Sequence, residues 1–184
     1  IKYAIEVGEL SPSKRQGVVK LIEKKDKDRR EIDNWRPISL LNVDTKIYSK
    51  LLANRLKLVL PHIISHEQTA FLKDRYIGEN VQMIQGVIEY CKRKQESGLL
   101  LAIDFRKAFD SVNHSFLFKT LKHFGFGQDF IGMIKTLHHG AENAVMNEGS
   151  TTRYFKLGRS CRQGDCLSPY LFILVIETLC FKIK

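Results

Sequence analysis

Three short segments carry the side chains best suited to chemistry, and each supplies a different kind of group. Residues 34–42 (NWRPISLLN) set the cation of Arg36 beside a proline that restricts the backbone. Residues 102–112 (AIDFRKAFDSV) set a carboxylate, Asp104, directly after an apolar run. Residues 162–172 (RQGDCLSPYLF) set an amide and a glycine ahead of a Ser-Pro helix start. Oxygen ligands hold hard metal ions, and cations with backbone donors neutralise phosphates, so these parts predict a metal and phosphate site.

The local sequence around Asp104 leaves other interpretations open. Residues 99–103 are continuously apolar and follow a Ser-Gly pair, which predicts a short buried strand that ends at Asp104. A carboxylate at the edge of a core needs a positive partner. An aspartate in this position also commonly accepts backbone N–H bonds from the next turn. Asp104 and Asp110 together would equally suit a nuclease.

The elements that must position these groups are a mixture of helices and short strands. Residues 17–24 and 35–41 predict two strands, joined by the polar residues 26–34 into a hairpin with a basic tip. A second hairpin is expected between residues 144 and 157. Helical spacing of apolar residues predicts helices over 45–60 (stopped by Pro61), 79–94, 114–124, 130–137 and from Ser168 to 183. Because no regular β-α-β alternation is present, the class we expect is α+β.

The net charge and the apolar content of the chain indicate which class of partner it binds. The chain has 184 residues, a formal net charge of +10 and an isoelectric point of about 9.5. Such a basic chain suits a polyanion such as nucleic acid, because Lys and Arg displace counterions from phosphates. No apolar stretch approaches the roughly 20 residues needed to span a bilayer, so no membrane partner is expected. The chain begins at Ile1 and ends within an apolar helical pattern, which is typical of a piece of a longer protein.

Four ordered blocks resemble a known family. They are WRPISLLNVDTKIYSKLLANRL, HEQTAFLKDRYIGENV, LLLAIDFRKAFDSVNHSFL and GRSCRQGDCLSPYLFILV. Together they resemble the reverse transcriptase domain of LINE-type, non-LTR retrotransposons, in the order and approximate spacing of that family. The resemblance implies a right-hand polymerase that copies RNA into DNA, with an RNA template and a DNA primer as partners. It implies partial fingers over residues 1–78 and, over residues 79–184, a palm with fingers-like insertions that is incomplete at its C-terminus.

The resemblance also assigns roles to individual residues. Asp104 matches the catalytic aspartate that binds two Mg²⁺ ions, and the carbonyl of Phe105 matches a further metal ligand. Phe109 matches the aromatic that excludes a 2′-hydroxyl from the incoming deoxynucleotide. The other residues matched to the dNTP are Arg36, Lys24, Lys25, Gln163 and Gly164, and those matched to the template-facing block are Gln68, Phe71, Arg75 and Asn80. The sequence departs from the family at Cys166-Leu167, where a Pro-Leu pair is usual.

One expected part of the family pattern is missing. Reverse transcriptases carry a second palm motif with paired aspartates, and this sequence contains no Asp-Asp pair. We therefore expect a fragment truncated before that motif, which does not polymerise by itself. The alternative is a degenerate or domesticated, maturase-like remnant that binds nucleic acid without catalysis, and a nuclease ranks third. The family implies a nuclear or cytoplasmic location, and the sequence does not indicate an oligomeric state.

Overall fold

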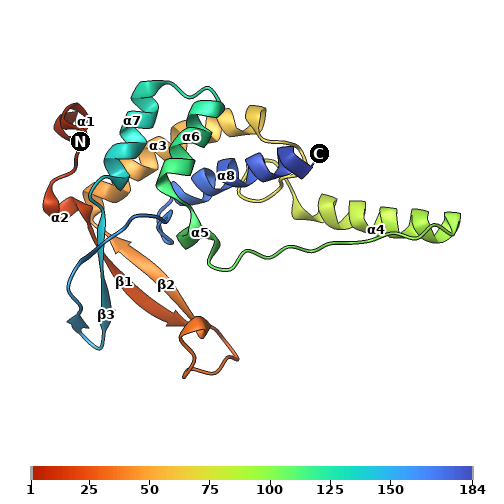
Figure 1. The fold of residues 1–184 in the computed structure, drawn as a ribbon, viewed down its shortest axis with the longest axis horizontal. Coiled ribbons are helices and arrows are strands. Elements are labelled where there is room, and N and C mark those ends of the chain that lie inside the picture. Colours follow the sequence, from red (N-terminus) through yellow and green to blue (C-terminus); the bar gives the residue numbers. More distant parts are fainter. Residues whose placement is uncertain (1, 184) are drawn as a thin grey trace.

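A helical layer joined to a small mixed sheet makes up the computed structural model, which describes residues 2–183 (Figure 1). The helices are α1 (Lys2–Val7), α2 (Pro12–Arg15), α3 (Val43–Ile63), α4 (Ile77–Lys94), α5 (Ala108–Ser111), α6 (His114–His123), α7 (Gln128–His138) and α8 (Ser168–Ile183), with a 3₁₀ turn at Ile32–Asn34. The strands are β1 (Gln16–Glu23), β2 (Trp35–Leu41), β3 (Glu142–Asn147), β4 (Ser150–Thr151) and β5 (Phe155–Lys156). The structure confirms the mixture of helices and short strands that the sequence predicts under the α+β class.

The sheet has the order β2-β1-β3-β4, with β5 paired to β3. The predicted first hairpin is present, because β1 and β2 pair antiparallel from Gly17 opposite Leu41 to Glu23 opposite Trp35. β3 returns from the helical layer and pairs parallel to β1. β2 is therefore an edge strand, and its outer backbone groups are available to a loop.

The core lies in the helical layer, where α3, α6, α7 and α8 pack together (Figure 1). Leu52 and Leu56 of α3 are buried against the apolar faces of the other three helices. Local capping sets where these helices begin: the side chain of Asn42 accepts from the Asp44 amide, and Asn113 caps α6 in the same way. The apolar periodicity predicted these helices because their buried faces follow it.

Two predictions about local structure are wrong. Residues 99–103 form no strand: they run as extended coil, and the side chains of Leu99 and Leu101 are 93% and 75% exposed. An apolar run becomes a strand only when a neighbouring backbone completes its ladder, and within residues 2–183 no strand pairs with it. Pro61 also fails to stop α3, which continues to Ile63. A proline in the last turn removes only one helical hydrogen bond.

α4 projects from the body, and the chain returns alongside it towards α5 (Figure 1). No residue of α4 is buried. Its apolar stripe, which includes Ile84, Val87 and Ile88, lines a surface groove of about 440 Å³ together with Leu99 and Leu100. The segment that carries Asp104 therefore runs from the end of α4 back to the helical layer, which it reaches at α5.

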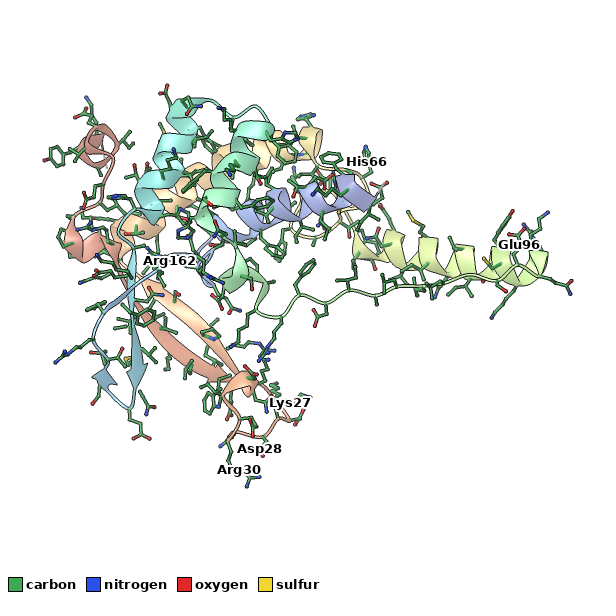
Figure 2. The ribbon with its side chains drawn as sticks, in the orientation of Figure 1. Lys27, Asp28, Arg30, His66, Glu96 and Arg162 are labelled. Carbon is green, nitrogen blue, oxygen red and sulfur yellow. The ribbon has the colours of Figure 1, made fainter. Side chains whose placement is uncertain are left out.

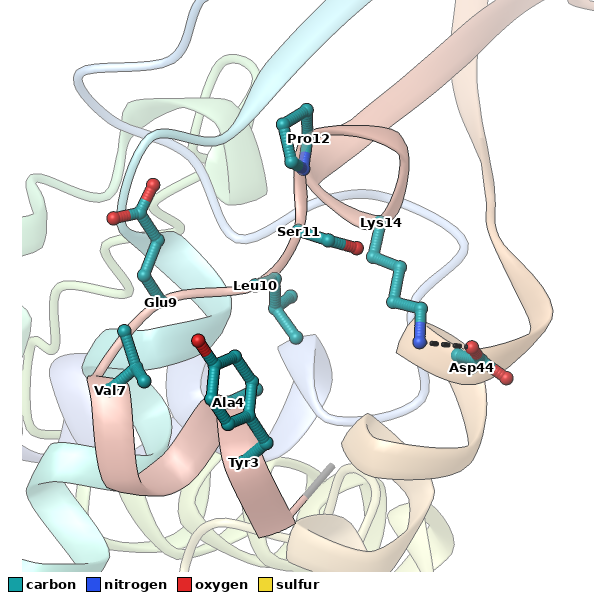
Figure 3. Close-up of a pocket in the computed structure, with 9 residues that line it drawn as sticks. All are labelled: Tyr3, Ala4, Val7, Glu9, Leu10, Ser11, Pro12, Lys14 and Asp44. Carbon is teal, nitrogen blue, oxygen red and sulfur yellow. Dashed lines mark ion pairs between the residues drawn. The ribbon is translucent and has the colours of Figure 1, made fainter.

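The N-terminal residues close one end of the helical layer. A cavity of about 340 Å³ lies between α1, α2 and the start of α3, and the Lys14 ammonium pairs with the Asp44 carboxylate at 2.6 Å across it (Figure 3). None of the candidate site residues lines this cavity. Among the helices of residues 2–183, none combines the length and apolar character required to cross a bilayer.

Candidate functional site

The three segments singled out in the sequence are joined in the fold, either by their own residues or by the residue directly before a segment, Asp33 or Cys161. The amide of Ser39 on β2 donates to the carbonyl oxygen of Gln163 at 2.8 Å. The amide of Cys161 donates to the carbonyl oxygen of Phe109 at 2.8 Å. The third link is ionic, because the carboxylate of Asp33 pairs with Lys107 at 3.2 Å and also with Arg106. Each segment is thus tied to the other two by hydrogen bonds or ion pairs.

Asp104 lies in the extended segment before α5, and its side chain is exposed. Phe105, the next residue, meets the ring of Phe172 on α8 edge-on at 6.4 Å between centroids. Phe109 packs on the same ring, with 5.1 Å between centroids. Phe172 therefore packs against Phe105 before α5 and Phe109 within α5, and these contacts hold the Asp104 segment at the edge of the helical layer.

Asp33 anchors the Asp104 segment to the β1–β2 hairpin. Hydrogen bonding to Lys107 and the charge of Arg106 lower the pKa of the Asp33 carboxyl. The backbone of Asp33 is also used, since its carbonyl oxygen accepts from the Lys24 ammonium at 2.8 Å. Lys24 thus closes the base of the hairpin loop, whereas Lys25 is exposed in the turn.

The hairpin carries the cations predicted to meet the triphosphate. Arg36 is exposed on β2, and it alternates along the strand with Trp35 and Pro37, so its side chain points to the opposite face. Lys27, Asp28 and Arg30 lie at the hairpin tip, remote from the helical layer (Figure 2). Arg30 pairs with Asp28 at 2.9 Å, which partly neutralises the tip.

Gly164 lies against the edge of β2. Its backbone has φ +102°, a conformation that L residues rarely adopt, and a Cβ there would lie 3.0 Å from the Ser39 carbonyl oxygen. It would also lie 3.3 Å from Cγ2 of Ile38, which shares a face of the sheet with Arg36. The absence of a side chain at Gly164 therefore allows the loop backbone to approach the hairpin closely.

Three of the residues matched to the template-facing block, Gln68, Phe71 and Arg75, lie in the loop between α3 and α4, and the fourth, Asn80, lies near the start of α4. Arg75 donates to the carbonyl oxygens of Ile64 at 3.0 Å and Gln68 at 2.7 Å, and also to those of Pro61 and Ser65. The side chain of Asn80 donates to the carbonyl oxygen of Glu67 at 3.0 Å, and Gln68 accepts from the Ala70 amide. Phe71 has φ +61° and is 57% exposed. Hydrogen bonds of Gln68, Arg75 and Asn80 therefore stabilise the loop, whereas the side chain of Phe71 is exposed to solvent.

Sequence reasoning missed a buried polar cluster behind Gln163. Arg162 is buried where the sheet meets the helices, and its Nη1 has no partner within residues 2–183 (Figure 2). Nearby, the ring of His138 meets that of His114 at 4.8 Å between centroids. Burial lowers the pKa of His138 to about 4. The sequence signal for His138 is its place four residues after Ile134, on the apolar stripe of α7, where it is half-buried.

Asp165 is a half-buried acidic residue of the same loop whose place the sequence did not indicate. Its Oδ1 accepts from the Ser49 hydroxyl of α3, and burial raises the pKa of its carboxyl. Burial likewise raises the pKa of the neighbouring Cys161 thiol to about 12. Arg162 and Asp165, which flank Gln163 and Gly164 in the sequence, therefore anchor this loop to the body of the protein.

The acidic residues do not complete a metal site. Asp104 and the Phe105 carbonyl are the ligands expected from the sequence, but two hard cations require several oxygen ligands. Across residues 2–183, no three His, Cys, Asp or Glu side chains come together in a metal-binding arrangement. The donor set of the described residues therefore does not fit a pair of divalent ions.

Comparison with known proteins agrees with the ordered blocks. A family model described as "Reverse transcriptase (RNA-dependent DNA polymerase)" matches residues 22–184. A transposon TX1 uncharacterized 149 kDa protein from Xenopus laevis is 41% identical over 95% of this chain, and the alignment covers 13% of that protein.

Two Drosophila melanogaster proteins extend the comparison. The retrovirus-related Pol polyprotein of type-2 retrotransposable element R2DM is 28% identical over 79% of this chain and 14% of its own length. A probable RNA-directed DNA polymerase from transposon X-element is 27% identical over 86% of this chain and 18% of its own length. The chain thus spans less than a quarter of each relative, and it belongs to the reverse transcriptase family, on the branch of non-LTR retrotransposon proteins.

Proposed function

We propose that this chain forms the fingers and part of the palm of an RNA-directed DNA polymerase, over residues 1–78 and 79–184 respectively. The observation that carries the proposal is the linkage of the three candidate segments. Ser39 contacts Gln163 directly, and the flanking residues Cys161 and Asp33 contact Phe109 and Lys107. Nothing in the spacing of these segments requires them to meet. Their contact supports a shared role in one site, and family membership supports the type of reaction.

In this proposal the hairpin and the Gln163 loop bind the incoming deoxynucleotide. Arg36 and Lys25 are exposed and free of ion pairs with other described residues, so they are available to the triphosphate. Gln163 and Gly164 are proposed to contact the nucleotide sugar and the template base from the side opposite Phe109. The net charge of +10 supports binding of an RNA template and a DNA primer.

Asp104 is proposed as the catalytic metal ligand of the complete polymerase. Divalent ions, when bound, stabilise the charge that develops during nucleotidyl transfer. Since the described residues add no cluster of acidic ligands to Asp104, transfer requires carboxylates beyond those residues. The exposed carboxylate of Asp104 is accessible to such a partner.

The test is primer extension by a longer chain of the same element that contains these 184 residues. Asp104→Asn is expected to reduce DNA synthesis by about a thousandfold or more, since a metal ion supplies several kcal/mol of transition-state stabilisation. Asp74→Asn is the matched control, because Asp74 is also exposed and, among residues 2–183, forms an ion pair with Lys73 alone, at 3.8 Å. Unchanged synthesis by the Asp104→Asn variant would overturn the assignment.

A binding-only function is the second candidate, and the incomplete donor set favours it for this chain by itself. The chain is then expected to bind an RNA–DNA duplex with an affinity that falls steeply as salt rises, and to extend no primer. Magnesium-dependent extension by residues 1–184 would contradict this expectation.

A further inference from the structure

Ser160 adopts a backbone conformation that a residue with a side chain disfavours. Its φ is +101°, and residues other than glycine rarely have a positive φ. A disfavoured backbone of this kind persists only where the surrounding structure holds it, and such positions gather at functional sites. Ser160 lies three residues before Gln163, so the contacts that hold it also bear on the position of the Gln163 loop.

The turn after Phe109 holds Ser160 at three of its groups. The Ser160 hydroxyl donates to Oδ1 of Asp110 at 3.1 Å, and the Ser160 amide donates to the carbonyl oxygen of Val112 at 2.8 Å. The Ser160 carbonyl oxygen accepts from Nε2 of His114 at 3.0 Å. Because Ser160 is only 9% exposed, these polar groups depend on the turn for their partners. We call this set of three hydrogen bonds the serine clamp.

The serine clamp joins the two segments that the proposed function places on opposite sides of the nucleotide sugar. Phe109 directly precedes Asp110, and Gln163 follows Ser160 on the same loop. The amide of Cys161, next to Ser160, donates to the carbonyl oxygen of Phe109 at 2.8 Å. The two segments are therefore connected at consecutive residues, and the clamp sets the separation between Phe109 and the Gln163 loop.

We propose that Asp110 and Ser160 are positioning residues that determine how strictly the site excludes ribonucleotides. Their hydrogen bond fixes the distance from the Phe109 ring to the Gln163 loop, and with it the room left for a 2′-hydroxyl. Rejection of a substrate by a clash requires a wall that does not yield. A loosened clamp admits the larger sugar and removes no group that binds the triphosphate. This inference rests on the proposed polymerase function and on the role of Phe109 in it.

The clamp itself is tested in the 184-residue chain by hydrogen exchange, which requires no catalytic activity. Ser160→Ala removes the hydroxyl, and Ser160→Gly removes it while also relieving the disfavoured φ. Exchange of the Cys161 amide, relative to the amides of α3, is expected to become about tenfold faster in both variants, the effect of one lost hydrogen bond. Unchanged relative exchange in both variants would overturn the proposal.

Ser115→Ala is the matched control for the loss of a serine hydroxyl. The hydroxyl of Ser115 donates to Oδ1 of Asn113 at 2.7 Å, at an exposed position on α6. This variant is expected to leave the relative exchange of the Cys161 amide unchanged. An equal acceleration in Ser115→Ala and Ser160→Ala would show that the effect is not specific to the clamp and would also overturn the proposal.

Sugar selection is measured in the longer polymerase, as the ratio of kcat/KM for a deoxynucleotide to kcat/KM for the matching ribonucleotide. Asp110→Ala and Ser160→Ala are each expected to lower this ratio about tenfold, and the double variant no further, because both changes remove one and the same bond. Asp110→Asn keeps an acceptor oxygen and is expected to retain the parent ratio. A purely structural role would change the amount of active enzyme, which cancels in the ratio.

The outcomes separate this inference from the proposed function. If Asp104→Asn abolishes synthesis but Asp110→Ala and Ser160→Ala keep the parent ratio, the polymerase assignment stands and the positioning role is overturned. If Asp104→Asn leaves synthesis unchanged, the proposed function fails, and the positioning role fails with it. A lowered ratio in Asp110→Ala and Ser160→Ala, with the parent ratio in Ser115→Ala, is the result we expect.

Discussion

The amide of Ser39 donates to the carbonyl oxygen of Gln163 at 2.8 Å, and this bond seats the loop before α8 on the open edge of β2. An edge strand leaves alternate backbone groups unpaired, and the loop satisfies one of them. The bond is possible only because Gly164 follows, with φ +102° and no side chain to meet the same strand. Two segments with candidate nucleotide-binding residues are thus held together by backbone contacts.

Gly164→Ala is expected to destabilise this contact. The new Cβ would lie 3.0 Å from the Ser39 carbonyl oxygen in a strained backbone conformation, for which a loss of about 1–3 kcal/mol is typical. Gly158→Ala is the matched control, because no atom lies within 4 Å of a Cβ at that position. Urea unfolding of both variants measures the difference. Equal free energies of unfolding would show that the loop does not depend on this close approach.

Asp33→Asn is expected to release the Asp104 segment from the hairpin. The substitution removes the charge that pairs with Arg106 and Lys107. Hydrogen exchange of the amides of residues 104–108 should become faster, while exchange in α3 stays unchanged. Asp74→Asn, at an exposed ion pair far from this segment, provides the control.

The same link has a predicted pH dependence. Lys107 and Arg106 lower the pKa of Asp33 from 3.8, so the ion pairs persist above that value and are lost as pH falls through the lowered pKa. Protection of residues 104–108 that vanished at neutral pH would contradict this sign.

Much of the helical layer could be predicted because burial follows helical spacing. Leu117 and Leu121 on α6, like Ile134 and Leu137 on α7, lie on the apolar stripes that the sequence shows. The first hairpin was also predictable, since the polar residues between its strands mark a turn. These are local signals, in which the pattern of a segment and its environment agree.

Residues 99–103 illustrate what local pattern does not determine. Their apolar run is the usual sign of a buried strand, yet no backbone within residues 2–183 pairs with them. Arg75 is a second example. A motif shows that a cation is present, but not whether that cation binds a ligand or backbone carbonyl groups of the protein itself. The strand pairing of residues 99–103 and the hydrogen-bond partners of Arg75 both depend on which segments meet in the fold. The spacing of residues within one segment does not determine those contacts.

The free energy of unfolding is expected to fall in mild acid because of His138. Burial lowers its pKa from 6.5 to about 4, so the folded state favours the neutral ring. Its full contribution is present above pH 6.5 and is lost as pH falls from there towards 4. Within that window the loss approaches about 1.4 kcal/mol per pH unit for one such group.

His138→Phe isolates this contribution, because it keeps an aromatic ring against His114 and Phe118 but removes the titration. Its unfolding free energy should vary less with pH than that of the parent chain. His114 and Asp165 also have shifted pKa values and remain in the variant, so the difference between the two profiles reports His138 together with its charge interaction with His114. His66→Gln, at an exposed histidine, should leave the parent profile unchanged. A parallel profile for His138→Phe would exclude His138 as the titrating group.

Arg75 is expected to stabilise the folded chain through its hydrogen bonds to the loop, rather than to contact the template. Its guanidinium donates to carbonyl oxygens of Pro61, Ile64 and Gln68, and to that of Ser65. Arg75→Ala should lower the free energy of unfolding by about 1–3 kcal/mol, because these part-buried acceptors lose their donor. Lys73→Ala, which removes a neighbouring exposed cation, should change it by less than about 0.5 kcal/mol. If Arg75 holds the loop, its removal must lower the free energy of unfolding, because four carbonyl groups of that loop lose their donor. A variant with reduced affinity for RNA but an unchanged free energy of unfolding would instead identify Arg75 as a template contact.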